Sequence, residues 1–159
     1  MITIGTVSTS RNLLENIFLI LKHKWEVGRI LLRMGHPILA LTHDMSKFFP
    51  GEIMHTIRVT GMSRGSEVGT AALLTHRHRN KHHWSHWVLV DEDYGIAPQE
   101  IPRKYVDEMV ADWMGAAKVQ DNDVVEWYEC YSSNMYLHEV TRSLLEKMID
   151  ELRITGGII

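Results

Sequence analysis

The sequence predicts an all-α fold: one helical domain of six to seven helices that spans residues 1–159. Three observations predict it. Apolar residues recur at helical spacing in several long segments, no run of residues keeps a period-two alternation, and no linker or internal repeat divides the chain. A length of 159 residues also suits a single domain with one core.

The first helix is predicted over residues 12–34, where a capping box precedes apolar residues at helical spacing. Gly35 ends it. A second, shorter helix is expected to begin at Pro37, which suits a first helical turn, and to carry the adjacent residues His43 and Asp44.

A third helix is expected to run from Pro50 or Gly51 to about Val59. The segment from Gly61 to Gly69 is rich in Gly and Ser, so we interpret it as a loop and as the candidate for a mobile lid. The fourth helix then begins near Ser66 and continues into a cluster of histidines.

The second half of the chain predicts three more helices. Residues 88–101 contain acidic residues, Gly and Pro, and are expected to form a loop rather than strands. Pro102 begins a helix that reaches about Ala117, and two further helices are expected over about residues 123–131 and 137–152.

Composition narrows the classes of protein. The net charge of −3 gives no general reason to bind nucleic acid or an anionic membrane. Cys130 is the sole cysteine, so an intramolecular disulfide is excluded. The first residues lack a signal-peptide pattern, and the apolar stretches are far too short to span a bilayer. We therefore expect a soluble, cytoplasmic protein, and the sequence leaves homo-oligomerisation open.

The ten residues from Thr75 to Trp84 contain four histidines, two arginines and one lysine. On a continuous helix, the histidines of this region divide between two faces. One face holds His76, Asn80 and His83, and the other holds His78, His82 and His86. The first face follows apolar residues one turn earlier, so we expect it to point inward. His82 remains a rival of His83, because adjacent histidines leave the face ambiguous by one position.

Other segments supply further groups of the kinds that bind metals. His43 and Asp44 offer an imidazole nitrogen and a carboxylate oxygen, which together suit Mn, Co, Zn, Fe or Ni better than Ca. His23 lies in the first helix, and Glu108 and Asp112 share one face of a later helix because they are four residues apart. Several helices can therefore direct imidazoles and carboxylates towards one centre.

The order of these residues resembles the HD superfamily of metal-dependent phosphohydrolases, in which an early helical His precedes an adjacent His-Asp pair and a final Asp. The resemblance implies that the core metal ligands are His23, His43, Asp44 and Asp112, and that the additional ligands are His76 and His83. It also implies a cofactor of one or two divalent transition-metal ions. In several branches a Lys three residues after the pair faces substrate phosphate, and this residue is Lys47 here.

A closer resemblance is to an uncharacterised family of bacteriophage and bacterial genomes, which carries the motifs H-D-x-S-K-F, N-x-H-H-W and E-M-x-x-D-W. These motifs stand here at residues 43–48, 80–84 and 108–113. The match covers roughly residues 20–145. The family has no settled activity, so the resemblance implies an architecture rather than a reaction.

Taken together, the residues suit the hydrolysis of a nucleotide or related phosphate ester by a metal-activated water. We expect Asp44, Lys47 and Glu52 to be catalytic, with Lys47 neutralising phosphate charge and Glu52 acting as a general base or as a partner of the ligands. Asn80 and Arg79, with Lys47, are expected to bind the substrate. Two alternatives remain: a non-catalytic metal-binding accessory protein that binds a nucleotide or a host protein, and a di-iron oxygenase of the HD type.

Overall fold

A computed structural model describes residues 13–48, 67–93 and 95–157. These residues form a mainly-α single domain with one small sheet, so the predicted fold class is confirmed. The third helix expected from residue 50 lies outside the described residues, as do Glu52 and the first part of the expected lid. The last part of that segment is helical instead, because the next helix already begins at Glu67.

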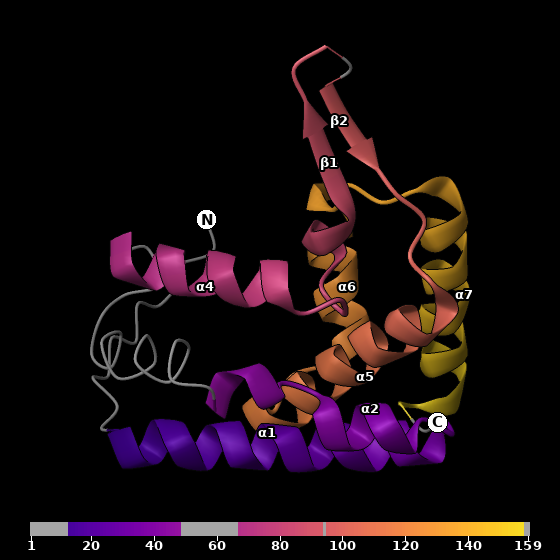
Figure 1. The fold of residues 1–159 in the computed structure, drawn as a ribbon. Coiled ribbons are helices and arrows are strands. Elements are labelled where there is room, and N and C mark those ends of the chain that lie inside the picture. The colour runs from indigo at the N-terminus through magenta and orange to yellow at the C-terminus, as the bar shows by residue number, and fades with distance from the viewer. Residues whose placement is uncertain (1–12, 49–66, 94, 158–159) are drawn as a thin grey trace, which may run out of the picture.

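The described helices are α1 (Leu13–Arg33), α2 (Pro37–Thr42), the 3₁₀ helix η1 (Met45–Phe48), α4 (Glu67–Arg79), the 3₁₀ helix η2 (Trp84–Trp87), α5 (Arg103–Gln120), α6 (Val124–Tyr131), the 3₁₀ helix η3 (Ser132–Asn134) and α7 (Glu139–Thr155). Helix α2 folds back along α1, and α5 packs against α1 and α7 (Figure 1). Helix α4 lies apart from α1, and its C-terminal end approaches α5 and α6 (Figure 1).

The core forms where α1, α5 and α7 meet. Each of these helices contributes apolar residues at helical spacing. The buried set includes Val27, Ile30 and Leu31 from α1, Val106, Met109 and Val110 from α5, and Leu145, Ile149 and Leu152 from α7. This core holds α5 at a fixed distance from α1, and both helices carry candidate metal ligands.

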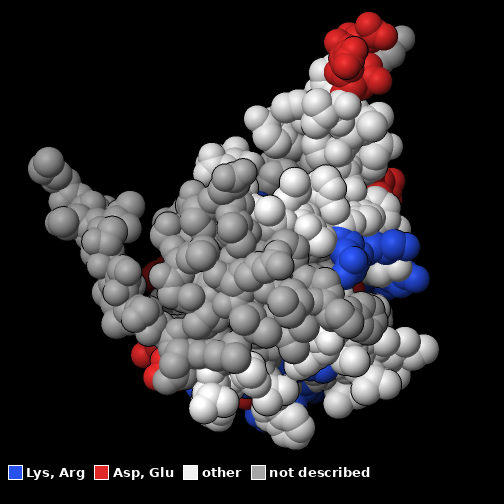
Figure 2. All heavy atoms as spheres, turned by 60° about the vertical axis from the view of Figure 1, so that its left-hand side comes forward, with Lys and Arg blue, Asp and Glu red and all other residues white. Residues whose placement is uncertain are grey.

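Residues 88–101 are not a loop throughout, contrary to the sequence-based expectation. Strands β1 (Val88–Asp91) and β2 (Gly95–Pro98) pair antiparallel and project from the helices as a hairpin (Figure 1). Each strand has four residues, which is too short for a period-two pattern to be recognised. Of the residues that indicated a loop, Glu92 and Asp93 lie in the turn of the hairpin, and Asp91 and Gly95 are the strand residues on either side of it; Figure 2 shows acidic side chains gathered at this tip.

Helices α1 and α5 come unusually close at Gly115. A Cβ atom added there would overlap Cγ2 of Val27 and lie 3.2 Å from the backbone nitrogen of Val27. Gly115 follows Asp112 by one helical turn, and Val27 follows His23 by one turn. The close approach therefore sets the separation of two candidate ligands, one on each helix.

We predict that Gly115→Ala destabilises the protein by about 1–3 kcal/mol, because an added methyl group overpacks the α1–α5 contact. The measurement is the free energy of unfolding from chemical denaturation. Val27→Ala should reduce the cost of the glycine substitution in the double variant, because it removes the overlapping methyl group. A cost that is the same with and without Val27 would contradict this explanation.

Candidate metal centre

The His43-Asp44 pair lies at the junction between two helices, not within a helix as the sequence had suggested. Helix α2 ends at Thr42, and η1 begins at Met45. Asp44 has a positive φ of 53°, a left-handed conformation that Asp adopts more readily than most residues. Because the two residues lie outside a regular helix, their side chains are not separated by the 100° rotation between successive helical residues. Both side chains turn into the interior, where the residues are 1% and 2% exposed.

Lys24 stabilises the junction between α2 and η1. Its Nζ atom donates hydrogen bonds to the carbonyl oxygens of Leu41, at 2.9 Å, and of His43, at 2.6 Å. The lysine thereby satisfies carbonyls at the end of α2 that have no partner within the helix. It also ties the His-Asp pair to α1, one residue from His23.

The first group of ligand atoms joins three segments of the chain. Nε2 of His23 lies 2.8 Å from Oδ1 of Asp112 and 3.9 Å from Oδ2 of Asp44. Nε2 of His43 lies 3.5 Å from both of these carboxylate oxygens. Two ligand atoms bound to one ion at about 2.1 Å lie roughly 3–3.5 Å apart, so the four residues suit a single metal ion.

The second group comes from the end of α4 and the turn after it. Helix α4 ends at Arg79, so the expected helical face that joined His76 to His83 does not exist. The side chain of Asn80 donates to the carbonyl oxygen of His76 at this helix end. The chain then turns, and this brings both His82 and His83 inward beside His76, with one ring nitrogen of each within 4.8 Å of the others. The choice between His82 and His83 is therefore not exclusive.

Asp44 links the two groups through its two carboxylate oxygens. Oδ2 faces His23 and His43, as described above. Oδ1 lies 3.4 Å from Nε2 of His76 and 3.6 Å from Nε2 of His82. The arrangement suits two ions, one in each group, with the carboxylate of Asp44 between them.

Buried atoms that lack hydrogen bonds point to the same interpretation. Within the described part of the chain, Nε2 of His43, His82 and His83 and Oδ1 of Asp44 are buried and have no hydrogen-bond partner. A buried polar atom that remains unsatisfied costs about 1–3 kcal/mol, so four in one place are unfavourable without a ligand. Imidazole nitrogens and a carboxylate oxygen are the donor atoms of Zn, Mn, Fe, Co and Ni sites. The residues therefore fit a transition metal.

Glu108 orients two of the imidazoles through their Nδ1 atoms. Its Oε1 atom accepts a hydrogen bond from Nδ1 of His43 at 3.0 Å, and Nδ1 of His82 lies 3.3 Å from the same oxygen. A proton held on Nδ1 leaves Nε2 free to bind a metal, which is the usual role of a carboxylate behind a ligating histidine. The sequence placed Glu108 on the face of Asp112 but gave no sign of this role.

The histidines of the centre differ in pKa, so some imidazoles favour the protonated form and others the neutral form. Burial alone would lower the pKa of His43, but the nearby carboxylates of Asp112, Glu108 and Asp44 outweigh it and raise the pKa to about 9. Burial and the neighbouring His82 lower the pKa of His83 to about 3, so its imidazole stays neutral and keeps a lone pair for a metal.

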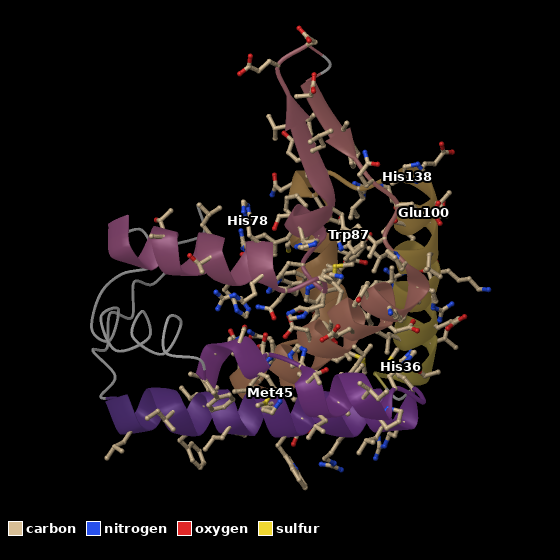
Figure 3. The ribbon with its side chains drawn as sticks, viewed as in Figure 1. His36, Met45, His78, Trp87, Glu100 and His138 are labelled. Carbon is tan, nitrogen blue, oxygen red and sulfur yellow. The ribbon has the colours of Figure 1, made fainter. Side chains whose placement is uncertain are left out.

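The remaining predicted site residues lie at different distances from the centre. Nζ of Lys47 contacts Oδ2 of Asp44, which places this cation beside the ligands. Asn80 hydrogen-bonds to Ser46 and contacts His76, so it supports the second group from α4. Arg79 is exposed at the end of α4. His78 lies on the side of α4 that faces away from α1 and α2, as Figure 3 shows.

A cavity of about 580 Å³ opens beside the ligands. His82, His83 and Asp112 form part of its wall. Other parts of the wall consist of the indole rings of Trp84, Trp113 and Trp127, the side chains of Gln120, Asn122 and Asn134, and Arg77. These three tryptophans pack on the core and also border this cavity. A molecule bound here reaches the candidate metal centre.

The fold and the site define a mainly-α domain with two linked His/Asp clusters that can hold metal ions. The chain belongs to a family of unknown function, DUF5662, whose family model matches residues 13–151. Neither the curated proteins nor the solved structures contain a significant match. No helix of the described residues is both long and apolar enough to cross a membrane.

We predict that Asp44→Ala removes most of the bound metal, because Asp44 contributes to both groups, and that His82→Ala removes mainly the ion of the second group. Metal content per chain is measured by elemental analysis of purified protein. His78→Ala is the matched control, since its side chain is exposed on the outer side of α4. Full occupancy in Asp44→Ala, or an equal loss in His78→Ala, would contradict the assignment.

We predict that Glu108→Gln weakens metal binding by roughly 10- to 100-fold, because the neutral amide no longer holds the proton on Nδ1 of two ligands. Competition with a chelator measures the affinity. Asp107→Asn is a control on the same helix, because Asp107 is buried but pairs with His36 and Arg103 instead. The interpretation fails if both variants bind metal equally well.

Proposed function

We propose that this protein is a metal-dependent phosphohydrolase of the HD type, which acts on a nucleotide or a related phosphate ester inside the cell. The observation that carries the proposal is the position of Asp44. Its carboxylate oxygens face two separate groups of imidazoles, and a second carboxylate, Asp112, completes the first group. Two ions held side by side in this way are typical of enzymes that cleave phosphate esters.

Different residues of the chain would bind the metal ions and neutralise the charge of the substrate. A divalent ion in either group would polarise a phosphoryl oxygen and make a nearby water more acidic. His23, His43, Asp44 and Asp112 would hold one ion, and His76, His82, His83 and Asp44 the other. Lys47 cannot ligate, because an ammonium has no lone pair, but it lies beside Asp44 and can neutralise a charged phosphate oxygen.

The cavity supports a substrate with a flat ring. Its volume of about 580 Å³ falls within the range usual for small-molecule sites. The aromatic rings of its wall can stack on a base, and the amides of Gln120, Asn122 and Asn134 can hydrogen-bond to the base edge or the sugar. Arg77 supplies a positive charge for a phosphate group.

The experiment that tests the proposal is a screen of nucleotides and simple phosphate esters with protein loaded with Mn, Co, Zn or Fe. Release of phosphate and chromatography of the products are measured. We expect metal-dependent release of phosphate from at least one nucleotide, abolished in Asp44→Ala. Oxygen consumption by iron-loaded protein without phosphate release would favour the oxygenase alternative instead.

We predict that Lys47→Ala leaves metal content unchanged and lowers kcat/KM by roughly 100-fold, about 2.7 kcal/mol of lost transition-state stabilisation. Lys47→Arg should recover only part of the loss, because its planar group places the charge differently. The control is Lys147→Ala, an exposed lysine of α7. Unchanged kcat/KM in Lys47→Ala would show that the lysine has no part in phosphate recognition.

A further inference from the structure

Helix α1 carries a second apolar row on its outer side, away from the core. The row consists of Leu14, Phe18, Leu21, Trp25 and Leu32, which are 78%, 66%, 50%, 67% and 58% exposed. Gly28 stands between the last two. With Gly28 counted, the six positions are successively four, three, four, three and four residues apart, which is the alternation that forms the seam of a coiled coil. Exposed apolar rows of this extent mark interaction surfaces.

Helix α2 widens this surface. Ile38 and Leu41 are 75% and 73% exposed, and a mainly apolar groove of about 500 Å³ runs between α1 and α2. The groove is lined in part by Leu21, Trp25 and Leu32. The exposed surface of the row and of α2's two residues totals roughly 900 Å², and each partner in a standard-size protein interface buries about 800 Å². The surface is large enough for a stable dimer.

The row is complementary to itself. If two copies of α1 pack antiparallel and cross at residue 23, Leu14 lies opposite Leu32 and Leu21 lies opposite Trp25. Phe18 then lies opposite Gly28, which lines the groove between α1 and α2, so the ring can enter that groove. In a two-fold interface, if residue i of one copy contacts residue j of the other, then residue j of the first copy also contacts residue i of the second. Every pair named here satisfies that condition.

Residues beside the row support the same register. Antiparallel packing brings Glu15 of one copy near Arg29 of the other, so opposite charges meet at both ends of the seam. Ile17 of one copy, which is 36% exposed, comes near α2 of the other copy and its exposed Ile38 and Leu41. Lys22 approaches its own counterpart near the two-fold axis, where its long side chain can extend into solvent.

From these observations we infer that the protein is a homodimer in which the α1 helices of two copies pack antiparallel along this row, with α2 at the edge of the interface. His23 lies on the opposite side of α1 from Leu21 and Trp25. The dimer therefore leaves the metal centre and its cavity open. This inference does not depend on the proposed enzymatic activity.

The first test is the mass of the protein in solution, measured by analytical ultracentrifugation over a range of concentrations. We expect wild-type protein at twice the chain mass of 18.4 kDa, and Leu21→Glu and Trp25→Glu as monomers with unchanged helical content. Ile154→Glu, at a residue that is 84% exposed on α7, is the matched control and should remain dimeric. A monomeric wild type, or dimeric seam variants, would overturn the inference.

The second test fixes the direction of the two helices by cross-linking. In a Cys130→Ser background, Lys22→Cys should join to its counterpart through a short bifunctional maleimide. Leu14→Cys should not, because two copies of residue 14 lie about 27 Å apart along the antiparallel axis. Cross-linking of residue 14 but not of residue 22 would overturn the antiparallel register.

Discussion

Much of the structure serves to bury the carboxylate of Asp44 among imidazoles. The side chain is 2% exposed, and burial of a charged group is costly unless opposite charge compensates for it. Lys47, the neighbouring imidazoles and, on our proposal, metal ions supply that charge. The requirement that these groups surround one residue explains why α1, the α2–η1 junction, the end of α4 and the middle of α5 converge.

Several contacts that have no chemical role of their own make this convergence possible. The small size of Gly115 lets α5 approach α1 until His23 and Asp112 meet. Lys24 fixes the end of α2 from the side of α1, and Glu108 sets the direction of two rings. The left-handed backbone of Asp44 is part of the same arrangement, since it follows the end of α2 and turns the carboxylate inward. Backbone strain of this kind is common at functional sites.

The sequence predicted the helices well, because apolar spacing, Pro37, Pro102 and the start of α6 after Asp123 mark their limits directly. It also identified most of the residues that the structure brings together. The sequence-based prediction was wrong where a helix ends without a proline or a capping residue to mark the end. Nothing in the local pattern indicated that α4 stops at Arg79, and that end is what brings both His82 and His83 inward. The role of Glu108 depends on a tertiary contact with residues 26 and 65 positions earlier, which helical spacing cannot reveal.

On our proposal Asp44 lies between two metal ions, on the side of α1 opposite the proposed dimer contact. The most direct measurement is anomalous X-ray diffraction from crystals of metal-loaded protein, recorded at the absorption edge of the bound metal. We expect two peaks about 3.5–4 Å apart, one beside His23, His43 and Asp112 and the other beside His76, His82 and His83. Metal bound only elsewhere on the chain, with no peak beside Asp44, would contradict it.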